Sequence, residues 1–142
     1  MIKPKRNKFI FQLFKFHLYF LLKRNFNSIK IEGDFNDTGK PILIIANHVS
    51  WWDGFWISYY SIKVLKRKIH FMMLEDQLKK HWYLKYVGAY SIKKNDRGVV
   101  ESLMCTKELL KDSGNMVFLF PQGEIKSMYN GSIKFKQGID RI

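Results

Sequence analysis

Two continuous apolar runs constrain the fold of this chain more than any other feature of its sequence. The first covers residues 41–46 (PILIIA) and the second covers residues 115–120 (NMVFLF). A strand that is apolar throughout, instead of alternating, is typical of a parallel sheet with helices on both faces. Helical patterns separate these runs from further strand-like segments. The sequence therefore predicts an α/β domain with a mixed or mostly parallel sheet flanked by helices.

The remaining elements follow from the same patterns. Strands are expected at 28–33, 68–74 and 89–92, and helices at 50–62, 75–87 and 96–113. Gly88 and Gly114 follow the last two helices and are placed to end them. A further element opens at Gly138, and the sequence stops at Ile142. We therefore expect the domain to be incomplete at its C-terminus.

The first 27 residues form a basic, apolar-rich segment. The net charge of the chain is +13 at pH 7, and residues 1–30 contain eight lysines and arginines and no acidic residue. A helix here would place a narrow basic stripe beside a wide surface of phenylalanines and leucines. The segment is too short and too interrupted to span a bilayer. It also lacks the apolar centre and the cleavage site of a secretory signal.

Three interpretations of this segment stay open. A thin basic stripe with bulky aromatic residues suits an amphipathic helix lying in the interface of an anionic membrane. The helix could instead dock on the domain, or a basic arm could bind nucleic acid, which the many large apolar residues disfavour.

The single cysteine, Cys105, excludes an intrachain disulfide and fits a reducing compartment. We expect a peripheral (monotopic) protein on the cytoplasmic side of a membrane, with membrane lipids and no nucleic acid as partners.

A histidine and an aspartate follow the first apolar run, in ANHVSWWDGFW (residues 46–56). Five residues apart on one helix, His48 and Asp53 could not meet, so His48 must precede the helix that contains Asp53. Ser50-x-x-Asp53 has the spacing of a capping box. Two interpretations remain: Asp53 only caps the helix, or it also holds His48 in one tautomer, leaving a ring nitrogen as general base.

A second corner follows the second apolar run. In FPQGEIKS (residues 120–127) the chain enters a Pro-Gln-Gly turn and then presents Glu124 and Lys126. Because strand ends on one edge of a parallel sheet converge, the two corners can share a crevice. No serine or cysteine is arranged as a nucleophile, so a histidine base would activate a substrate hydroxyl. The other histidines have no ligand spacing with His48, and no metal site is expected.

Residues 47–53 (NHVSWWD), 87–94 (VGAYSIKK) and 120–123 (FPQG) occur in this order. They resemble three blocks of the glycerolipid acyltransferase family, whose best-known members acylate lysophosphatidic acid. These are the NHxxxxD motif, a block with a glycine, an apolar strand and a basic residue, and the FPEG block. The resemblance extends from about residue 29 to the end. It divides the chain into an N-terminal membrane-interface helix (1–27) and an acyltransferase domain (28–142).

The resemblance implies an O-acyltransferase of phospholipid biosynthesis, similar to 1-acylglycerol-3-phosphate acyltransferases. Such an enzyme moves a fatty acyl group from acyl-CoA or acyl carrier protein to a lipid hydroxyl, and it needs no further cofactor. His48 would be the general base, and Asp53 would orient it. Backbone N–H groups near Gly123 would stabilise the oxyanion. The substrate-binding residues that the blocks imply are Asn47, Ser50, Gly88, Lys94, Phe120, Pro121, Gln122, Gly123, Glu124 and Lys126.

The sequence departs from the family pattern in two places. Gln122 stands where the family has a glutamate, although Glu124 follows two residues later. Lys94 stands where the family has an arginine, which keeps the charge but loses bidentate phosphate geometry. The acceptor therefore stays open among a glycerol phosphate, another lysophospholipid, and a glycolipid or pigment hydroxyl. The family's fourth block is absent because the chain ends first. A catalytically inactive lipid-binding or membrane-associated protein is the alternative function.

Overall fold

A computed structural model describes residues 1–93, 96–127, 129, 134–136, 138 and 142. Within these residues, four strands form one sheet in the order β1-β4-β2-β3, and every pairing is parallel. The strands are β1 (Ile42–Ile45), β2 (Lys68–Leu74), β3 (Ala89–Ile92) and β4 (Asn115–Leu119). The α/β class and the mostly parallel sheet are thus confirmed.

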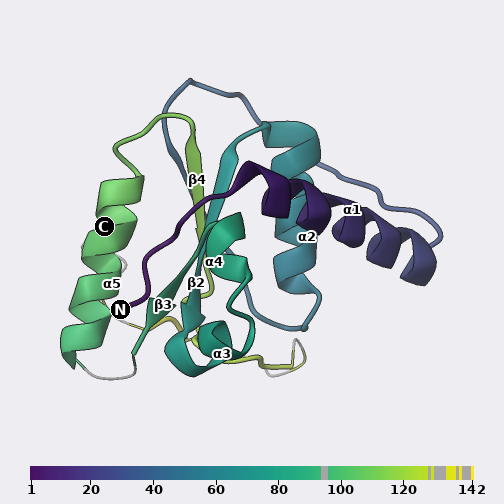
Figure 1. The fold of residues 1–142 in the computed structure, drawn as a ribbon. Helices are drawn as coiled ribbons and strands as arrows, with labels where there is room; N and C mark the ends of the chain where they lie inside the picture. Colours follow the sequence, from purple (N-terminus) through teal and green to yellow (C-terminus); the bar gives the residue numbers. More distant parts are fainter. Residues whose placement is uncertain (94–95, 128, 130–133, 137, 139–141) are drawn as a thin grey trace.

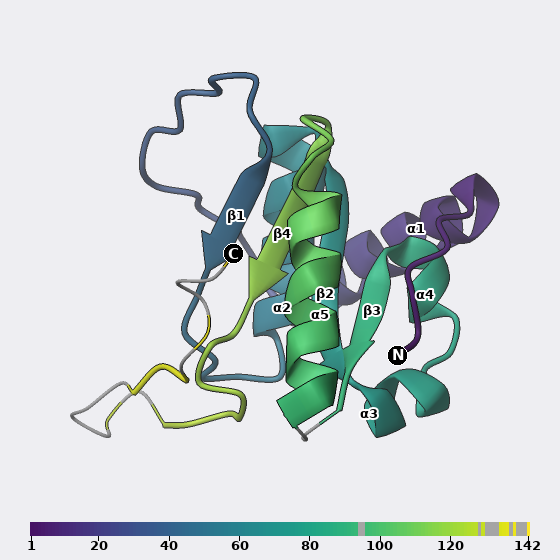
Figure 2. The same ribbon diagram turned by 90° about the vertical axis from the view of Figure 1, so that its left-hand side faces the viewer.

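Helices cover the two faces of the sheet unequally (Figure 1). On one side are α1 (Lys8–Asn25), α2 (Asp53–Tyr60), α3 (Glu75–Lys80) and α4 (Leu84–Val87), and on the other is α5 (Asp96–Leu109). Figure 2 shows α5 lying in front of the sheet. The buried apolar residues separate in the same way. Ile69 and Met116 belong to the core under α2 to α4, whereas Tyr90 and Val117 belong to the core under α5.

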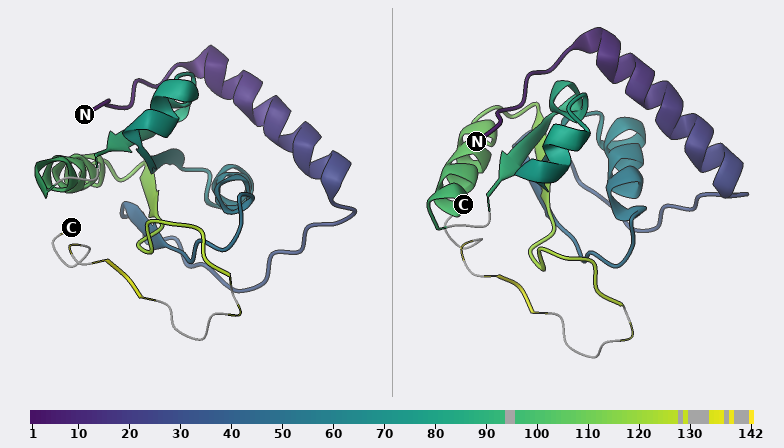
Figure 3. Two further views of the ribbon diagram at one scale, coloured as in Figure 1. Left: turned by 90° about the horizontal axis from the view of Figure 1, so that it is seen from below. Right: turned by 60° about the horizontal axis from the view of Figure 1, so that its bottom comes forward.

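The N-terminal helix α1 is docked on the domain, as Figure 3 shows from two sides. Its start is fixed by Asn7, whose side-chain oxygen accepts hydrogen bonds from the backbone N–H groups of Phe9 and Ile10. Leu18 and Leu22 are fully buried, and α1 contacts both α2 and α4. The helix is therefore held by its own apolar residues against the other helices.

A second apolar stripe of α1 faces away from the domain. Its four members are 54–75% exposed, and they are Phe9, Leu13, Phe16 and Phe20. Positions separated by four, three and four residues lie along one side of a helix. No helix in the described part of the chain is both long enough and apolar enough to cross a membrane.

Three expected elements differ from the structure. Residues 28–33 form no strand, because this segment crosses the outside of α2 instead of reaching the sheet. The expected helix 75–87 is interrupted at residues 81–83, where consecutive aromatic side chains have low helix propensity. The helix after the first corner continues beyond α2 as a π-helical turn, η1 (Ser61–Leu65), and Lys66 ends it in the left-handed conformation.

Candidate active site

The two corners meet because β1 and β4 are neighbouring strands. Their register pairs Ile45 with Leu119, so His48 and Gln122 each lie three residues beyond a paired position. The backbone N–H of His48 donates to Oε1 of Gln122 at 2.7 Å. The backbone N–H of Lys126 donates to the carbonyl of His48 at 2.9 Å. These two hydrogen bonds join the corners at the carboxyl edge of the sheet.

One carboxylate oxygen organises the first corner. Oδ2 of Asp53 lies 2.9 Å from Nδ1 of His48. The same oxygen accepts the backbone N–H groups of Val49 at 2.7 Å and of Ser50 at 2.9 Å. The Ser50 hydroxyl in turn accepts the N–H of Trp52 at 3.1 Å, within the turn that precedes α2. Asp53, the first residue of α2, therefore fixes the turn that leads into the helix and contacts the imidazole at the same time.

The imidazole of His48 is held on its other side by Phe120. The two rings are stacked, with centroids 4.1 Å apart and planes 11° apart. The side chain of His48 is 23% exposed and that of Asp53 is 13% exposed. An ionised Asp53 favours the tautomer that carries its proton on Nδ1, which leaves the lone pair of Nε2 free. No described residue forms a hydrogen bond with Nε2, so that nitrogen can accept a proton.

The turn of the second corner is closed by its own backbone. Gly123 has φ +70°, and its N–H donates to the Phe120 carbonyl at 3.0 Å. This N–H is therefore engaged within the turn, and the expectation that N–H groups near Gly123 stabilise an oxyanion stays a prediction. Lys136 lies over the same turn: its N–H donates to Pro121 at 2.9 Å, and a Cβ on Gly123 would lie 2.7 Å from its Nζ. Lys136 was not predicted as a site residue, because its only signal in the sequence is its charge.

Most of the expected substrate-binding residues lie on the two corners. Asn47 is exposed beside His48, and Gln122 is 4% exposed beneath it. The side chains of Glu124 and Lys126 form an ion pair of 3.2 Å. The members of the predicted set that the two corners contain are Asn47, Ser50, Phe120, Pro121, Gln122, Gly123, Glu124 and Lys126.

Gly88 of the middle block does not join this cluster. Gly88 precedes β3 and therefore lies at the amino edge of the sheet, opposite His48. Its φ is +138°, and a Cβ there would lie 2.1 Å from the carbonyl oxygen of Ile69. The structure thus accounts for the glycine at position 88, because the backbone of Ile69 leaves no room there for a side chain. Lys94 lies outside the described residues, and the preceding Lys93 is 3.7 Å from the carboxylate of Glu75.

The described residues contain no group of three or more His, Cys, Asp or Glu side chains placed to hold a metal ion. The chemistry that the geometry supports at the two corners is proton transfer by a histidine paired with a carboxylate. Such a pair lacks a protein nucleophile and therefore suits a reaction in which a substrate group attacks.

Comparison with known proteins supplies the family. A family model described as Acyltransferase matches residues 22–142, which includes both corners and the whole sheet. Comparisons with curated proteins and with solved structures found no significant match. The match covers most of the chain, and it agrees with the parallel sheet and with the order of the sequence blocks. The chain belongs to the Acyltransferase family.

Proposed function

We propose that this acyltransferase transfers a fatty acyl group from acyl-CoA or acyl carrier protein to a hydroxyl of a lysophospholipid or a related lipid. In this proposal His48 is the general base. The observation that carries it is the 2.9 Å contact between Nδ1 of His48 and Oδ2 of Asp53, at a corner where no described residue binds Nε2. A base at this position can activate a hydroxyl brought by the acceptor.

The proposed reaction proceeds by direct transfer. Nε2 of His48 accepts the hydroxyl proton as the acceptor oxygen attacks the thioester carbonyl. The new C–O bond forms, the C–S bond of the tetrahedral intermediate breaks, and the imidazolium returns its proton to the departing thiolate. Asp53 stays ionised and stabilises the imidazolium. General base catalysis of this kind is typically worth about 10²–10⁴-fold in rate.

The residues around the imidazole are proposed to hold the substrates. Asn47 and Ser50 flank His48 on one corner, and Lys126 and Lys136 bring two ammonium groups to the other. Lys126 already pairs with Glu124, whereas Lys136 has no ion pair with any described residue, so its charge is the less neutralised of the two for a phosphate group. A phosphate-bearing lipid or the phosphates of the donor would suit this side of the site.

Membrane association is the second part of the proposal. The exposed apolar stripe of α1 carries large side chains with no partner in the described structure, and lysines flank it along the helix. A helix of this kind can lie in the bilayer interface while its other face stays packed on the protein. We propose a peripheral position on the cytoplasmic side of a membrane, where anionic lipids attract basic segments. The lipid substrates would be taken from that surface.

Release of free thiol from acyl-CoA or acyl carrier protein, in the presence of a lysolipid, tests the enzymatic proposal. Wild-type protein should release thiol, and His48→Ala should lose nearly all of this turnover while it keeps the fold. His81→Ala is the matched control, because His81 is exposed in the turn between α3 and α4. Equal thiol release by wild type and His48→Ala would contradict the role of His48. Absence of release across a broad acceptor panel, with lipid binding retained, would favour the inactive lipid-binding alternative.

A further inference from the structure

The first turn of α2, which begins at Asp53, has no side-chain cap. Trp52 precedes it in helical conformation, and the side chain of Trp52 makes no capping hydrogen bond. The Trp52 carbonyl accepts the N–H of Trp56 at 3.0 Å, which closes the turn. Gly54, the second residue of the helix, has low helix propensity and weakens the turn further. Packing from another element is therefore the means left to hold this turn in place.

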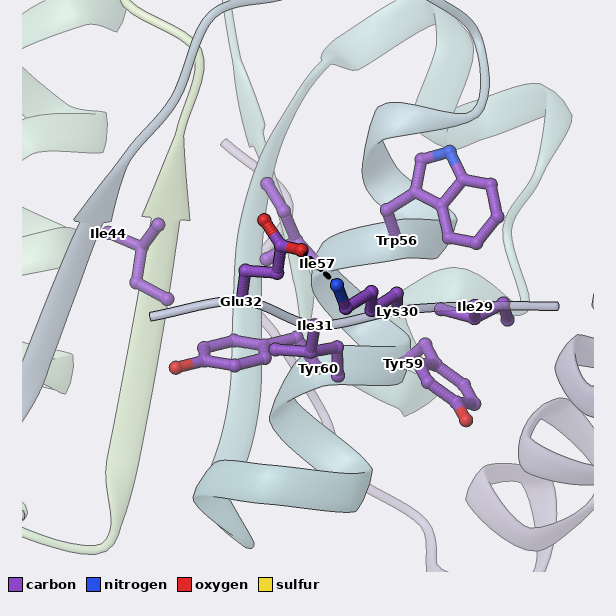
Figure 4. A pocket seen from close by; sticks show the side chains of 9 residues that line it. All are labelled: Ile29, Lys30, Ile31, Glu32, Ile44, Trp56, Ile57, Tyr59 and Tyr60. Atoms are coloured by element: carbon purple, nitrogen blue, oxygen red, sulfur yellow. Dashed lines mark ion pairs between the residues drawn. The ribbon is translucent and has the colours of Figure 1, made fainter. Parts of the chain in front are cut away.

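Phe26, the residue that follows α1, packs on this turn. The centroid of its ring lies 5.1 Å from that of Trp52 and 4.4 Å from that of Trp56, at interplanar angles of 85° and 63°. Aromatic pairs prefer such edge-to-face arrangements. Trp52 and Trp56 are four residues apart and lie on one side of the helix. Figure 4 shows Trp56 on the side of α2 away from Ile44 of β1. Phe26 thus holds the turn from the side away from β1.

The position of Phe26 is itself fixed by α1. Its N–H donates to the carbonyl of Leu22 at 2.9 Å, which ends the last turn of that helix. Leu22 is buried, so this end of α1 is anchored on the domain. The other ring contacts of Trp52 come from its own segment, from Trp51 and Phe55. Among the described residues, Phe26 is therefore the aromatic contact that connects Trp52 to a separate and anchored element.

The proposed catalytic pair is consequently held from two sides. The second corner holds His48, because Gln122 accepts its N–H and the ring of Phe120 stacks on its imidazole. Asp53 is the first residue of the turn on which Phe26 packs. The 2.9 Å contact between Nδ1 of His48 and Oδ2 of Asp53 joins these two supports. A loss of either support should disturb this contact.

We infer that Phe26 is a positioning residue for the acyl transfer: its ring holds the first turn of α2 so that Asp53 stays in contact with His48. This inference rests on the proposed function. A displacement of about 1 Å at a catalytic group can lower a rate by about 10²-fold. Because Phe26 acts through Asp53 and not on a substrate, its loss should lower kcat and leave KM nearly unchanged.

Three variants test this inference. Phe26→Ala removes the ring, and Phe26→Tyr keeps it. Tyr19→Ala is the matched control, because Tyr19 is also a half-buried residue of the α1 region and its ring contacts Tyr59 of α2 at 5.8 Å. Tyr59 follows Asp53 by six residues, so this contact supports the other end of α2. Thermal unfolding should show that all three variants are folded. Thiol release from palmitoyl-CoA is then measured with the lysolipid that the wild type uses best.

Phe26→Ala should lower kcat by about 10–10²-fold, with KM within about twofold of the wild type. Phe26→Tyr and Tyr19→Ala should stay close to the wild type. An unchanged kcat in Phe26→Ala would overturn the inference. An equal loss of kcat in Tyr19→Ala would also overturn it, because the effect would then come from a general loosening of α1.

A double variant distinguishes positioning from a merely structural effect. Asp53→Asn already removes the charge through which Phe26 is inferred to act. Adding Phe26→Ala to Asp53→Asn should therefore lower kcat little further, because residues that act as a unit are not additive. If Phe26→Ala lowers kcat by the same factor in the wild type and in Asp53→Asn, Phe26 does not act through Asp53.

Amide hydrogen exchange separates this inference from the proposed function. The N–H groups of Val49 and Ser50 donate to Oδ2 of Asp53, so their exchange reports the place of that carboxylate without any substrate. Exchange should be faster in Phe26→Ala and unchanged in Tyr19→Ala. Faster exchange in Phe26→Ala, with no thiol release by the wild type from any donor, would reject the proposed function and leave Phe26 as the support of Asp53. Thiol release by the wild type, with unchanged exchange in Phe26→Ala, would reject the role of Phe26 and leave the proposed function standing.

Discussion

Gln122 of the second corner accepts the backbone N–H of His48 through its side-chain oxygen at 2.7 Å. Gln122 is 4% exposed, so the N–H that it satisfies is shielded from water. Only an oxygen acceptor is needed for this contact. A glutamine can therefore serve where the related blocks carry a glutamate, because both side chains place an oxygen at the same distance from the backbone.

This relationship predicts different results for two substitutions of Gln122. Gln122→Glu keeps an acceptor for the His48 N–H and should leave thiol release near the wild-type level. Gln122→Leu has a similar size but no acceptor, and leaving the N–H unpaired should cost about 1–3 kcal/mol of unfolding free energy. It should also lower turnover, because His48 is no longer fixed. Wild-type stability and turnover in Gln122→Leu would contradict this account.

Asp53 has a structural role in the turn before α2 and a proposed catalytic role, and two substitutions separate them. Asp53→Asn keeps an oxygen for the N–H groups of Val49 and Ser50, so stability should change little. Asp53→Ala leaves both N–H groups without that acceptor and should cost about 1–3 kcal/mol of unfolding free energy. Thiol release should fall by about 10²–10⁴-fold in both variants, because neither can stabilise the His48 imidazolium. Full turnover by Asp53→Asn would leave Asp53 with its structural role alone.

Gly88 is predicted to be required for stability. An alanine there would place Cβ 2.1 Å from the Ile69 carbonyl oxygen at φ +138°, a conformation that side chains rarely adopt. Gly88→Ala should lower the free energy of unfolding by about 3 kcal/mol or more in urea denaturation. Gly54→Ala is the control, because a Cβ there meets nothing within 4 Å and α2 should gain up to about 1 kcal/mol. Equal stability of the two variants would contradict the backbone explanation for Gly88.

The sequence predicted the parts of this structure that depend on local pattern. The apolar runs at 41–46 and 115–120 became β1 and β4, and the spacing of His48 and Asp53 required a loop followed by a helix, as found. The convergence of the two corners followed from parallel topology. These inferences need only periodicity, capping chemistry and the geometry of a parallel sheet.

The sequence did not predict how distant segments are placed relative to one another. Apolar patterning does not tell which strand pairs with which, so the insertion of β4 between β1 and β2 could not be read from it. Residues 28–33 alternate like a strand, yet they cross α2, because the alternating isoleucines can pack on a helix as well as on a sheet. The contact of Gln122 with the His48 backbone and the position of Lys136 over Gly123 depend on how distant segments meet.

Because the side chain of His70 is buried, we predict that the protein loses stability in mild acid. His70 is 4% exposed in β2, and burial, aided by the charge of Arg6, lowers its pKa from 6.5 to about 4. The folded protein therefore keeps His70 neutral while the unfolded chain binds a proton below about pH 6.5. Stability from this group is complete above that pH and is lost as pH falls toward 4, by up to about 3 kcal/mol.

Denaturation at pH 7 and at pH 4.5 checks this prediction. The free energy of unfolding should fall more between these pH values in the wild type than in His70→Leu, which has no proton to bind. The Asp37 and Asp112 carboxyls have lowered pKa values, because Asp37 interacts with the Gly39 N–H and Asp112 with Lys68. Protonation of these two carboxyls destabilises both the wild type and His70→Leu, and it takes place at lower pH. The same pH dependence with and without His70 would show that its burial does not govern acid stability.

The exposed stripe of α1 gives the final prediction, which concerns the membrane. Phe9 and Phe16 are 71% and 75% exposed, and neither belongs to the apolar core. If they enter a bilayer interface, replacing both by serine should weaken sedimentation with phosphatidylglycerol liposomes by about tenfold or more, because each phenylalanine contributes apolar area. Tyr129→Ser with Phe135→Ser removes two other exposed aromatic rings and is the matched control. High salt should weaken wild-type binding as well, since the helix and its flanks are basic.

Retention on DNA, measured in parallel, separates the membrane role of the stripe from nucleic-acid binding. Binding to a nucleic acid would depend on the lysines and arginines and would be unaffected by the loss of Phe9 and Phe16, whereas binding to a bilayer requires both the charge and the rings. Liposome binding that survives the double serine variant, or retention on DNA at moderate salt, would therefore contradict a membrane role for this stripe.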